Sequence, residues 1–143
     1  MVEILDRQAS VTDAQAAEYF FRDLAEANGV GASSEMEFQT MSVVPRLESS
    51  SLPPTARTCG GIGRQLVRQG RDTDLAGNPR QVTAAWVRVD LCVVRVPHVE
   101  SEILLTFTSP MDQTGAASLL SEWDELFVQM LQSFCIKDWT LFG

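Results

Sequence analysis

The segment VTAAWVRVDLCVVRV (Val82–Val96) decides the fold, together with ESEILLTFT (Glu100–Thr108) after a Pro97-His98 turn. From Ala85 to Val93 every second residue is apolar, a period of two that predicts a strand with one face in the core. The other face mixes Trp, Arg and Asp side chains, which indicates partial cover. The returning strand is predicted to continue the buried face with Ile103, Leu105 and Phe107.

A helix is predicted over Ala117–Phe134, because its apolar residues follow a three-to-four spacing that buries one stripe on a sheet. Acidic residues gather in its first half, where they favour a helix N-terminus. Strands in a meander with a covering helix predict an α+β fold, an antiparallel sheet flanked by helices. The apolar stripe consists of Leu120, Trp123, Phe127, Leu131 and Phe134.

The first half of the chain gives weaker signals. Strands are predicted over Glu35–Leu47 and Thr58–Gly70, and a short helix over Val2–Ala9 with apolar and charged residues on opposite sides. The segment Thr12–Asn28 is ambiguous. A capping-box pattern at its start and a glycine after its end favour a helix, whereas the aromatic run Tyr19-Phe20-Phe21 favours a strand.

Length and charge set limits on function. The chain has 143 residues, enough for one domain with a buried core, so a single domain over 1–143 is predicted. The net charge of −8 makes nucleic acid a poor partner and favours a basic protein surface, unless the acidity only maintains solubility. No apolar run approaches the ~20 residues that span a bilayer, and the first residues lack the basic flank of a secretory signal. We therefore expect an intracellular protein without a membrane partner.

Candidate catalytic residues are few. The run Gly60-Gly61-Ile62-Gly63 lacks the Gly-Lys-Ser/Thr ending of a phosphate loop, so a bend or a close backbone approach is favoured. Nothing in the spacing of Cys59 and His98 supports a nucleophile with its base, and a single histidine makes a zinc site improbable. Asp90 is expected to pair with the neighbouring Arg88 or with a residue of another strand. We predict no catalytic residue, no metal and no cofactor.

An acidic pair is the candidate binding site. On the predicted first helix Glu3 and Asp6 are three residues apart, so their carboxylates point the same way. Such a pair can hold a Lys or Arg of a partner protein through charge-assisted hydrogen bonds. A solvated helix face is the alternative interpretation, because most exposed acids contribute nothing measurable.

Five segments together resemble one family. Val2-Glu3-Ile4-Leu5-Asp6 resembles the Ile-Val-acidic-Leu-Leu-acidic segment of the Ran guanine nucleotide release factors, the Mog family of nuclear import proteins. The run Tyr19–Leu24 resembles the family's aromatic run ending in Glu-Asp-Leu, and Val89–Val96 its long strand ending in Leu-Ile-Arg-Leu. Glu100–Phe107 resembles its Thr-Asp-hydrophobic strand, and Asp138–Gly143 its terminal Asp-x-x-Leu/Ile-Phe motif. Each motif is weak alone, but their order covers essentially the whole chain.

The resemblance implies an α/β/α sandwich similar to the extrinsic oxygen-evolving (PsbP-like) subunits of photosystem II, and it favours a strand over Glu18–Leu24. It implies a protein of the nucleus and cytoplasm that binds the small GTPase Ran. We expect the protein to be a monomer. Binding would promote release of guanine nucleotide from Ran and so regulate nuclear protein import. The family's two acidic Ran-binding positions correspond to Glu3 and Asp6.

One family feature has no counterpart in this sequence. Family members carry a further N-terminal stretch, with a Leu-Phe-Gly-Gly-Ala-type strand, that contributes to the Ran-facing surface. Full release activity is therefore not assured by the resemblance, and unpaired backbone groups are expected at a sheet edge. The alternative function is a fold relative that acts as a protein-binding scaffold with a partner other than Ran.

Overall fold

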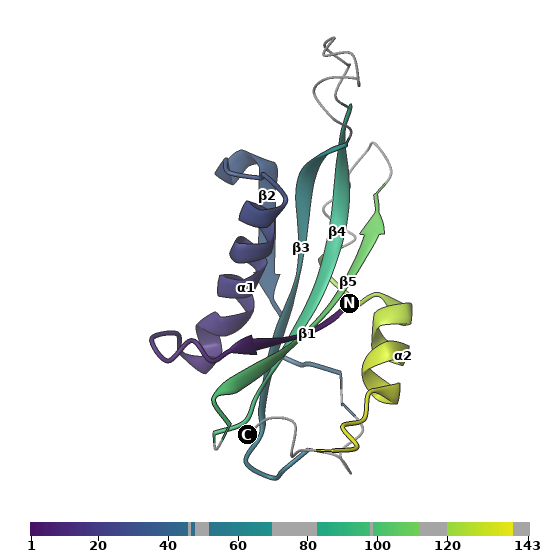
Figure 1. Ribbon diagram of the computed structural model, residues 1–143. Coiled ribbons are helices and arrows are strands. Elements are labelled where there is room, and N and C mark those ends of the chain that lie inside the picture. Colours follow the sequence, from purple (N-terminus) through teal and green to yellow (C-terminus); the bar gives the residue numbers. More distant parts are fainter. Residues whose placement is uncertain (46, 48–51, 70–82, 98, 112–119, 139–143) are drawn as a thin grey trace, which may run out of the picture.

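The computed structural model describes residues 1–45, 47, 52–69, 83–97, 99–111 and 120–138. These residues form a sheet with helices on both sides (Figure 1). In chain order the elements are β1 (Val2–Asp6), α1 (Asp13–Ala27), the 3₁₀ helix η1 (Ser33–Glu35), β2 (Met36–Thr40), β3 (Arg57–Gln69), β4 (Thr83–Arg95), β5 (Ser101–Pro110) and α2 (Glu125–Ser133).

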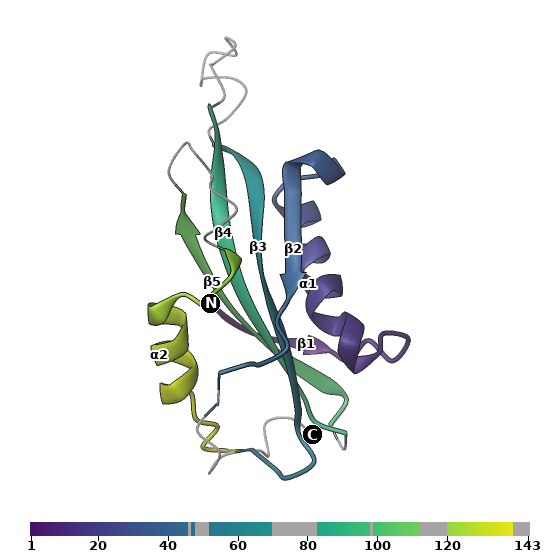
Figure 2. The same cartoon turned by 180° about the vertical axis from the view of Figure 1, so that it is seen from behind.

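The five strands lie in the order β1-β5-β4-β3-β2, and all neighbours are antiparallel. The long strands β3, β4 and β5 form the middle, and the two short strands lie at the edges. Figures 1 and 2 show α1 on one face of this sheet and α2 on the other. The predicted α/β/α arrangement is therefore confirmed.

Each helix covers its own half of the core. On the α1 face, α1 packs against β4 residues that include Val89 and Leu91, both fully buried. On the α2 face, Phe127 and Leu131 of α2 lie in a second buried cluster with Cys92 of β4. Because β4 is buried on both faces from Arg88 to Arg95, the second face of this part is better covered than its sequence predicted. None of the helices in the described ranges is long and apolar enough to cross a bilayer.

The return strand corrects one prediction. Cys92 lies opposite Leu105, and Val94 lies opposite Ile103. Directly opposed residues in an antiparallel pair share a face, so Ile103 and Leu105 lie on the α2 face with Cys92. They do not continue the face formed by the alternating residues from Ala85 to Val93, as the sequence suggested. The face on which Ile103 and Leu105 lie depends on the pairing register of β4 and β5, which the sequence alone does not give.

The ambiguous segment Thr12–Asn28 is a helix, and the strand predicted over Glu18–Leu24 is wrong. Residues Phe20 and Phe21 are 3% and 1% exposed, whereas Tyr19 is 39% exposed. A strand would send Phe20 and Phe21 to opposite faces, but a helix places both within one apolar stripe. The terminal signals were correct: the side chain of Gln15 accepts from the Thr12 hydroxyl at 2.8 Å, and Gly29 follows the helix with φ of 73°.

The last helix is shorter than predicted and begins only at Glu125. The side chain of Asp124 caps it by accepting from the Leu126 backbone N–H at 2.9 Å. Leu120 and Trp123 precede the helix, yet Leu120 is buried and Trp123 packs against the cluster on the α2 face. Residues 112–119, at which the predicted helix was to start, lie outside the described residues.

The glycines of β3 allow close packing, as the sequence suggested. A Cβ on Gly61 would lie 2.2 Å from the Phe38 ring, and one on Gly63 would lie 2.4 Å from the Phe21 ring. These two rings stack at 4.7 Å between centroids, so the glycines let α1 and β2 approach the strand.

Candidate partner-binding site

The segment that carries the two candidate acids is a strand, and the helix predicted over Val2–Ala9 is wrong. Residues Val2–Asp6 form β1, which pairs with β5 at the edge of the sheet. Exposed and half-buried side chains alternate along this segment, as is typical of a strand. Leu5, one of the half-buried residues, packs against the core on the α1 face. Pairing with β5 outweighs the modest support that one Glu3–Arg7 helix pair could give.

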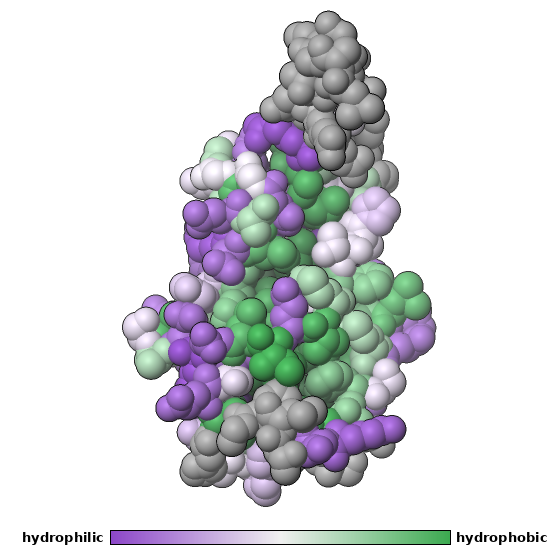
Figure 3. All heavy atoms as spheres, in the orientation of Figure 1, coloured by the Kyte–Doolittle hydropathy of each residue, from purple (hydrophilic) through white to green (hydrophobic). Residues whose placement is uncertain are grey.

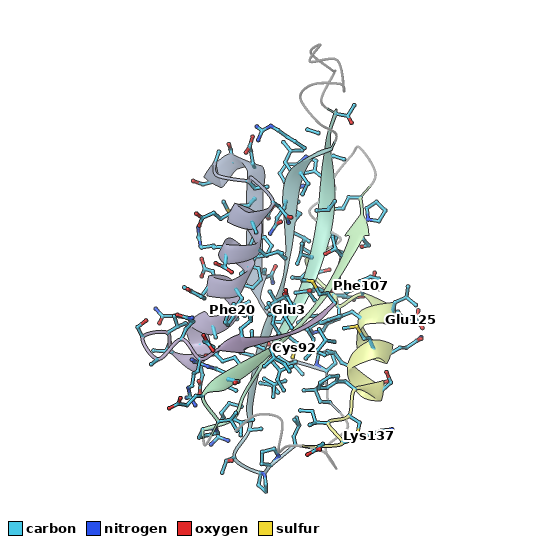
Figure 4. The ribbon with its side chains drawn as sticks, viewed as in Figure 1. Glu3, Phe20, Cys92, Phe107, Glu125 and Lys137 are labelled. Carbon is cyan, nitrogen blue, oxygen red and sulfur yellow. The ribbon has the colours of Figure 1, made fainter. Side chains whose placement is uncertain are left out.

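This change separates the two acids. In a strand, residues three apart point to opposite faces, so Glu3 lies on the α1 face and Asp6 on the α2 face. Glu3 is partly exposed and Asp6 is exposed. Figure 4 places Glu3 at the front of the molecule, between the two helices. Within the described ranges neither carboxylate forms an ion pair with an arginine, so both remain accessible to a partner.

A buried ion pair fixes the chain just after β1. Arg95 contacts Glu102 at 2.7 Å, and these side chains are 3% and 0% exposed. Arg95 also donates to the carbonyl oxygens of Gln8 and Val11, and it pairs with Asp13 at the start of α1 at 2.9 Å. The backbone N–H of Gln8 donates to the same Glu102 oxygen. The strand edge is therefore held rigidly between β5 and α1.

The hydrogen bonds of β1 show which of its backbone groups face outward. Met1 exchanges backbone hydrogen bonds with Thr106, and the Arg7 N–H donates to the Glu100 carbonyl. In an antiparallel pair the bonded residues alternate, so the odd-numbered residues of β1 face β5. The backbone groups of Val2, Ile4 and Asp6 point away from the sheet.

Exposed apolar side chains accompany this edge. Val2 is 50% exposed, Ile4 is 58% exposed, and Met1 is 57% exposed. Figure 3 shows apolar side chains gathered over the front of the molecule, around a central hydrophilic one. A depression of about 320 Å³, here called the β1 groove, is lined by Val2, Ile4, Ile103, Phe134, Cys135, Ile136, Lys137 and Asp138.

A second buried ion pair positions α2 beside the groove. Asp90 is fully buried and accepts from Arg88 at 2.6 and 2.8 Å, as predicted. It also accepts from the backbone N–H of Asp124, the cap residue of α2, at 3.0 Å. The hydrogen bond from Arg88 to Asp90 raises the pKa of the guanidinium, so Arg88 stays charged. The start of α2 is thereby fixed to β4.

Burial makes Cys59 and Cys92 poor nucleophiles. Burial raises the pKa of Cys59 to about 11 and that of Cys92 to about 12, which keeps both thiols protonated. His98, the other half of the catalytic pair that the sequence argued against, lies outside the described residues. Among the residues that the structure describes, no cluster of three or more His, Cys, Asp or Glu side chains could hold a metal ion.

A strand edge with apolar side chains and accessible carboxylates has the chemistry of a protein-binding surface. Comparison with known sequences identifies the class further. The chain belongs to the family of the Ran-interacting Mog1 protein, whose profile matches residues 1–110. One relative is the Ran guanine nucleotide release factor of Danio rerio, 29% identical over 154 residues that span 100% of this chain and 76% of the relative. No solved structure matches.

The sequence predicted Glu3 and Asp6 as binding residues but did not predict the groove that Val2 and Ile4 line. The helical interpretation placed Val2 and Leu5 together on a buried side, and so hid the exposed pair Val2 and Ile4. The alternation of Val2, Ile4 and Asp6 with Glu3 and Leu5 was the available signal. Five residues are too few for a period alone to decide between strand and helix.

Proposed function

We propose that this chain is a single Ran-binding domain that promotes release of guanine nucleotide from Ran and so regulates nuclear protein import. It would act in the nucleus and cytoplasm as a monomer, without a cofactor and without catalytic chemistry of its own. The family match over residues 1–110 is the observation that carries the proposal. The name of the Danio rerio relative supports both the partner and the activity.

The accessible acids on β1 supply the recognition chemistry. Glu3 and Asp6 flank the strand edge on its two faces, so a partner would need cationic side chains on both sides of the edge. The net charge of −8 steers the chain toward such a basic surface. A protein that binds Ran lowers the affinity of Ran for nucleotide only if it binds nucleotide-free Ran more tightly than nucleotide-bound Ran. The nucleotide affinity falls by the same factor by which the two binding affinities differ.

The test compares two charge-matched double variants. Glu3→Lys with Asp6→Lys changes the charge of β1, whereas Asp23→Lys with Glu26→Lys makes the same change on the exposed side of α1. Binding to Ran with GDP, with GTP and without nucleotide would be measured by titration, and release by the fluorescence of a labelled GDP. We expect the β1 variant to bind about tenfold more weakly at low salt, and the α1 variant to lose much less.

Two results would count against the proposal. Absence of any complex with Ran at micromolar concentration would remove Ran as the partner. Equal losses in the β1 and α1 variants would mean that only the overall charge matters, and Glu3 and Asp6 would leave the site. Either result would favour the alternative, a fold relative that acts as a protein-binding scaffold with a partner other than Ran.

A further inference from the structure

We propose that the buried ion pair of Arg95 and Glu102 positions Asp6 for binding to the partner, and that it leaves Glu3 unaffected. This assignment rests on the proposed function and adds two positioning residues to the recognition of Ran. Neither residue would touch Ran, because both side chains are at most 3% exposed. Both act on the backbone that carries Asp6.

Asp6 is the last residue of β1, and its backbone groups point away from β5. The pairing with β5 therefore holds Asp6 only through its neighbours Leu5 and Arg7. The Arg7 N–H donates to the Glu100 carbonyl at 2.8 Å, at a point where β1 has already ended. Glu3, in contrast, lies inside the strand and has paired residues on both sides. A loosened strand end would therefore move Asp6 before it moved Glu3.

The ion pair holds the chain two residues after Asp6. The N–H of Gln8 donates to Oε1 of Glu102 at 2.9 Å. The carbonyl oxygen of Gln8 accepts from Arg95 at 3.0 Å. Asp6 therefore lies between the β5 pairing on one side and the ion pair on the other.

Arg95 uses all five of its N–H donors at this junction. Two donors bind Glu102, at 3.1 and 2.7 Å, and a third binds the Gln8 carbonyl. The remaining two bind the Val11 carbonyl at 2.8 Å and the Asp13 carboxylate at 2.9 Å. The acceptors thus belong to β5, to the segment after β1 and to the start of α1. Because a buried ion pair adds little net stability over apolar side chains, we assign to Arg95 the role of fixing the geometry of this junction.

Glu102→Gln loosens the junction with little change of shape. The amide oxygen can take the place of Oε1, which accepts the three hydrogen bonds from Gln8 and Arg95. The amide nitrogen then takes the place of Oε2, which has no hydrogen-bond partner in the part of the chain that the structure describes. The charge that holds Arg95 is lost. Asp90→Asn is the matched control, because it makes the same change in a second buried ion pair, which fixes α2 and not β1.

The experiment is a double-mutant cycle in which affinity for Ran is measured by titration, with urea curves to show that each variant is folded. We expect Glu102→Gln and Asp6→Asn each to weaken binding about threefold. The double variant should lose no more than about fourfold, whereas independent effects would give about ninefold. In the same cycle the losses of Glu3→Gln and Glu102→Gln should multiply, because the β5 pairing holds Glu3 in either case. The Asp90→Asn control should lose less than about 1.5-fold.

A second readout follows the backbone of the free protein. Amide nitrogen relaxation in Glu102→Gln should show increased fast motion at Arg7 and Gln8 and unchanged motion at Glu3. If Glu102→Gln does not fold, Asp13→Asn replaces it, since the Asp13 side chain is 53% exposed and its loss removes one acceptor of Arg95. We expect the same coupling to Asp6→Asn with a smaller loss of affinity.

Four results would overturn the assignment. Losses that multiply between Glu102→Gln and Asp6→Asn would show that Glu102 does not act through Asp6, while continued binding to Ran would leave the proposed function standing. Equal losses in Glu102→Gln and Asp90→Asn would mean that only overall stability is affected. Unchanged binding in Asp6→Asn would remove Asp6 from the site and the ion pair with it. Absence of a Ran complex with the unsubstituted chain would overturn both the assignment and the proposed function.

Discussion

The buried pair of Asp90 and Arg88 gives the sharpest stability prediction. Asp90→Asn keeps the shape of the side chain and removes its charge. The carboxylate is 0% exposed and accepts two hydrogen bonds from Arg88 and one from the Asp124 backbone. The amide oxygen of the variant could still accept from Asp124. The main effect of the substitution is therefore that the guanidinium of Arg88, whose side chain is 11% exposed, loses the negative charge of Asp90 beside it.

The expected cost follows from burial. Breaking a buried ion pair from one side costs about 3–5 kcal/mol, because the other charge loses its compensation. Arg88 is not fully buried and also donates to the Glu122 carbonyl, so the lower end of this range applies. We expect a loss of about 3 kcal/mol in the free energy of unfolding, a large fraction of the roughly 5–15 kcal/mol that stabilises most domains. The midpoint of thermal unfolding should fall by roughly 10 °C.

Urea unfolding followed by tryptophan fluorescence would measure this loss. Glu18→Gln is the matched control, because Glu18 pairs with Arg22 at 2.8 Å on the exposed side of α1. Such surface pairs contribute about 0–1 kcal/mol, so the control should change little. Combining Asp90→Asn with Arg88→Met should cost less than the sum of the single changes, since the two groups interact directly. A loss below about 1 kcal/mol in Asp90→Asn would refute the reasoning.

Two further predictions concern β3 and the thiols. Gly61→Ala should destabilise by about 1–3 kcal/mol in urea unfolding, because its Cβ would meet the Phe38 ring at 2.2 Å, whereas Gly31→Ala, with open space around it, should not. At pH 8 an alkylating reagent should modify the exposed Cys135 before Cys59, which is held as a thiol by a pKa of about 11. Since the unfolded thiol ionises near 9.0, stability should fall as pH rises from 9 to 11, and fall less in Cys59→Ala.

The sheet was predictable because its signals repeat over many residues. The strands predicted over Val82–Val96, Glu100–Thr108 and Thr58–Gly70 match β4, β5 and β3 within a few residues. In β4 the period of two is sustained from Ala85 to Val93, which leaves little room for another structure. The strand predicted over Glu35–Leu47 was right in kind but too long, as β2 ends at Thr40.

The two errors near the N-terminus have a common physical cause. In β1 and α1 the local pattern was compatible with both structures, and pairing or packing with distant residues decided. For Val2–Asp6 the deciding partner is β5, about a hundred residues further along the chain. For α1 the capping signals were correct, and the strand was predicted against them because the resemblance to the Mog family favoured it. Contacts with distant residues decide the secondary structure of short ambiguous segments, and local sequence patterns do not contain those contacts.

The strand geometry of β1 changes what Glu3 and Asp6 can do together. On a helix, two acids on one side could share a single arginine, and removing either would weaken the effect of the other. On opposite faces of a strand, about 10 Å apart, they need separate cations. The losses from Glu3→Lys and Asp6→Lys in Ran binding should therefore add, within about 0.5 kcal/mol. Strong coupling between the two substitutions would show that the partner contacts both acids from one side. That result would contradict the strand structure of β1, which places the acids on opposite faces.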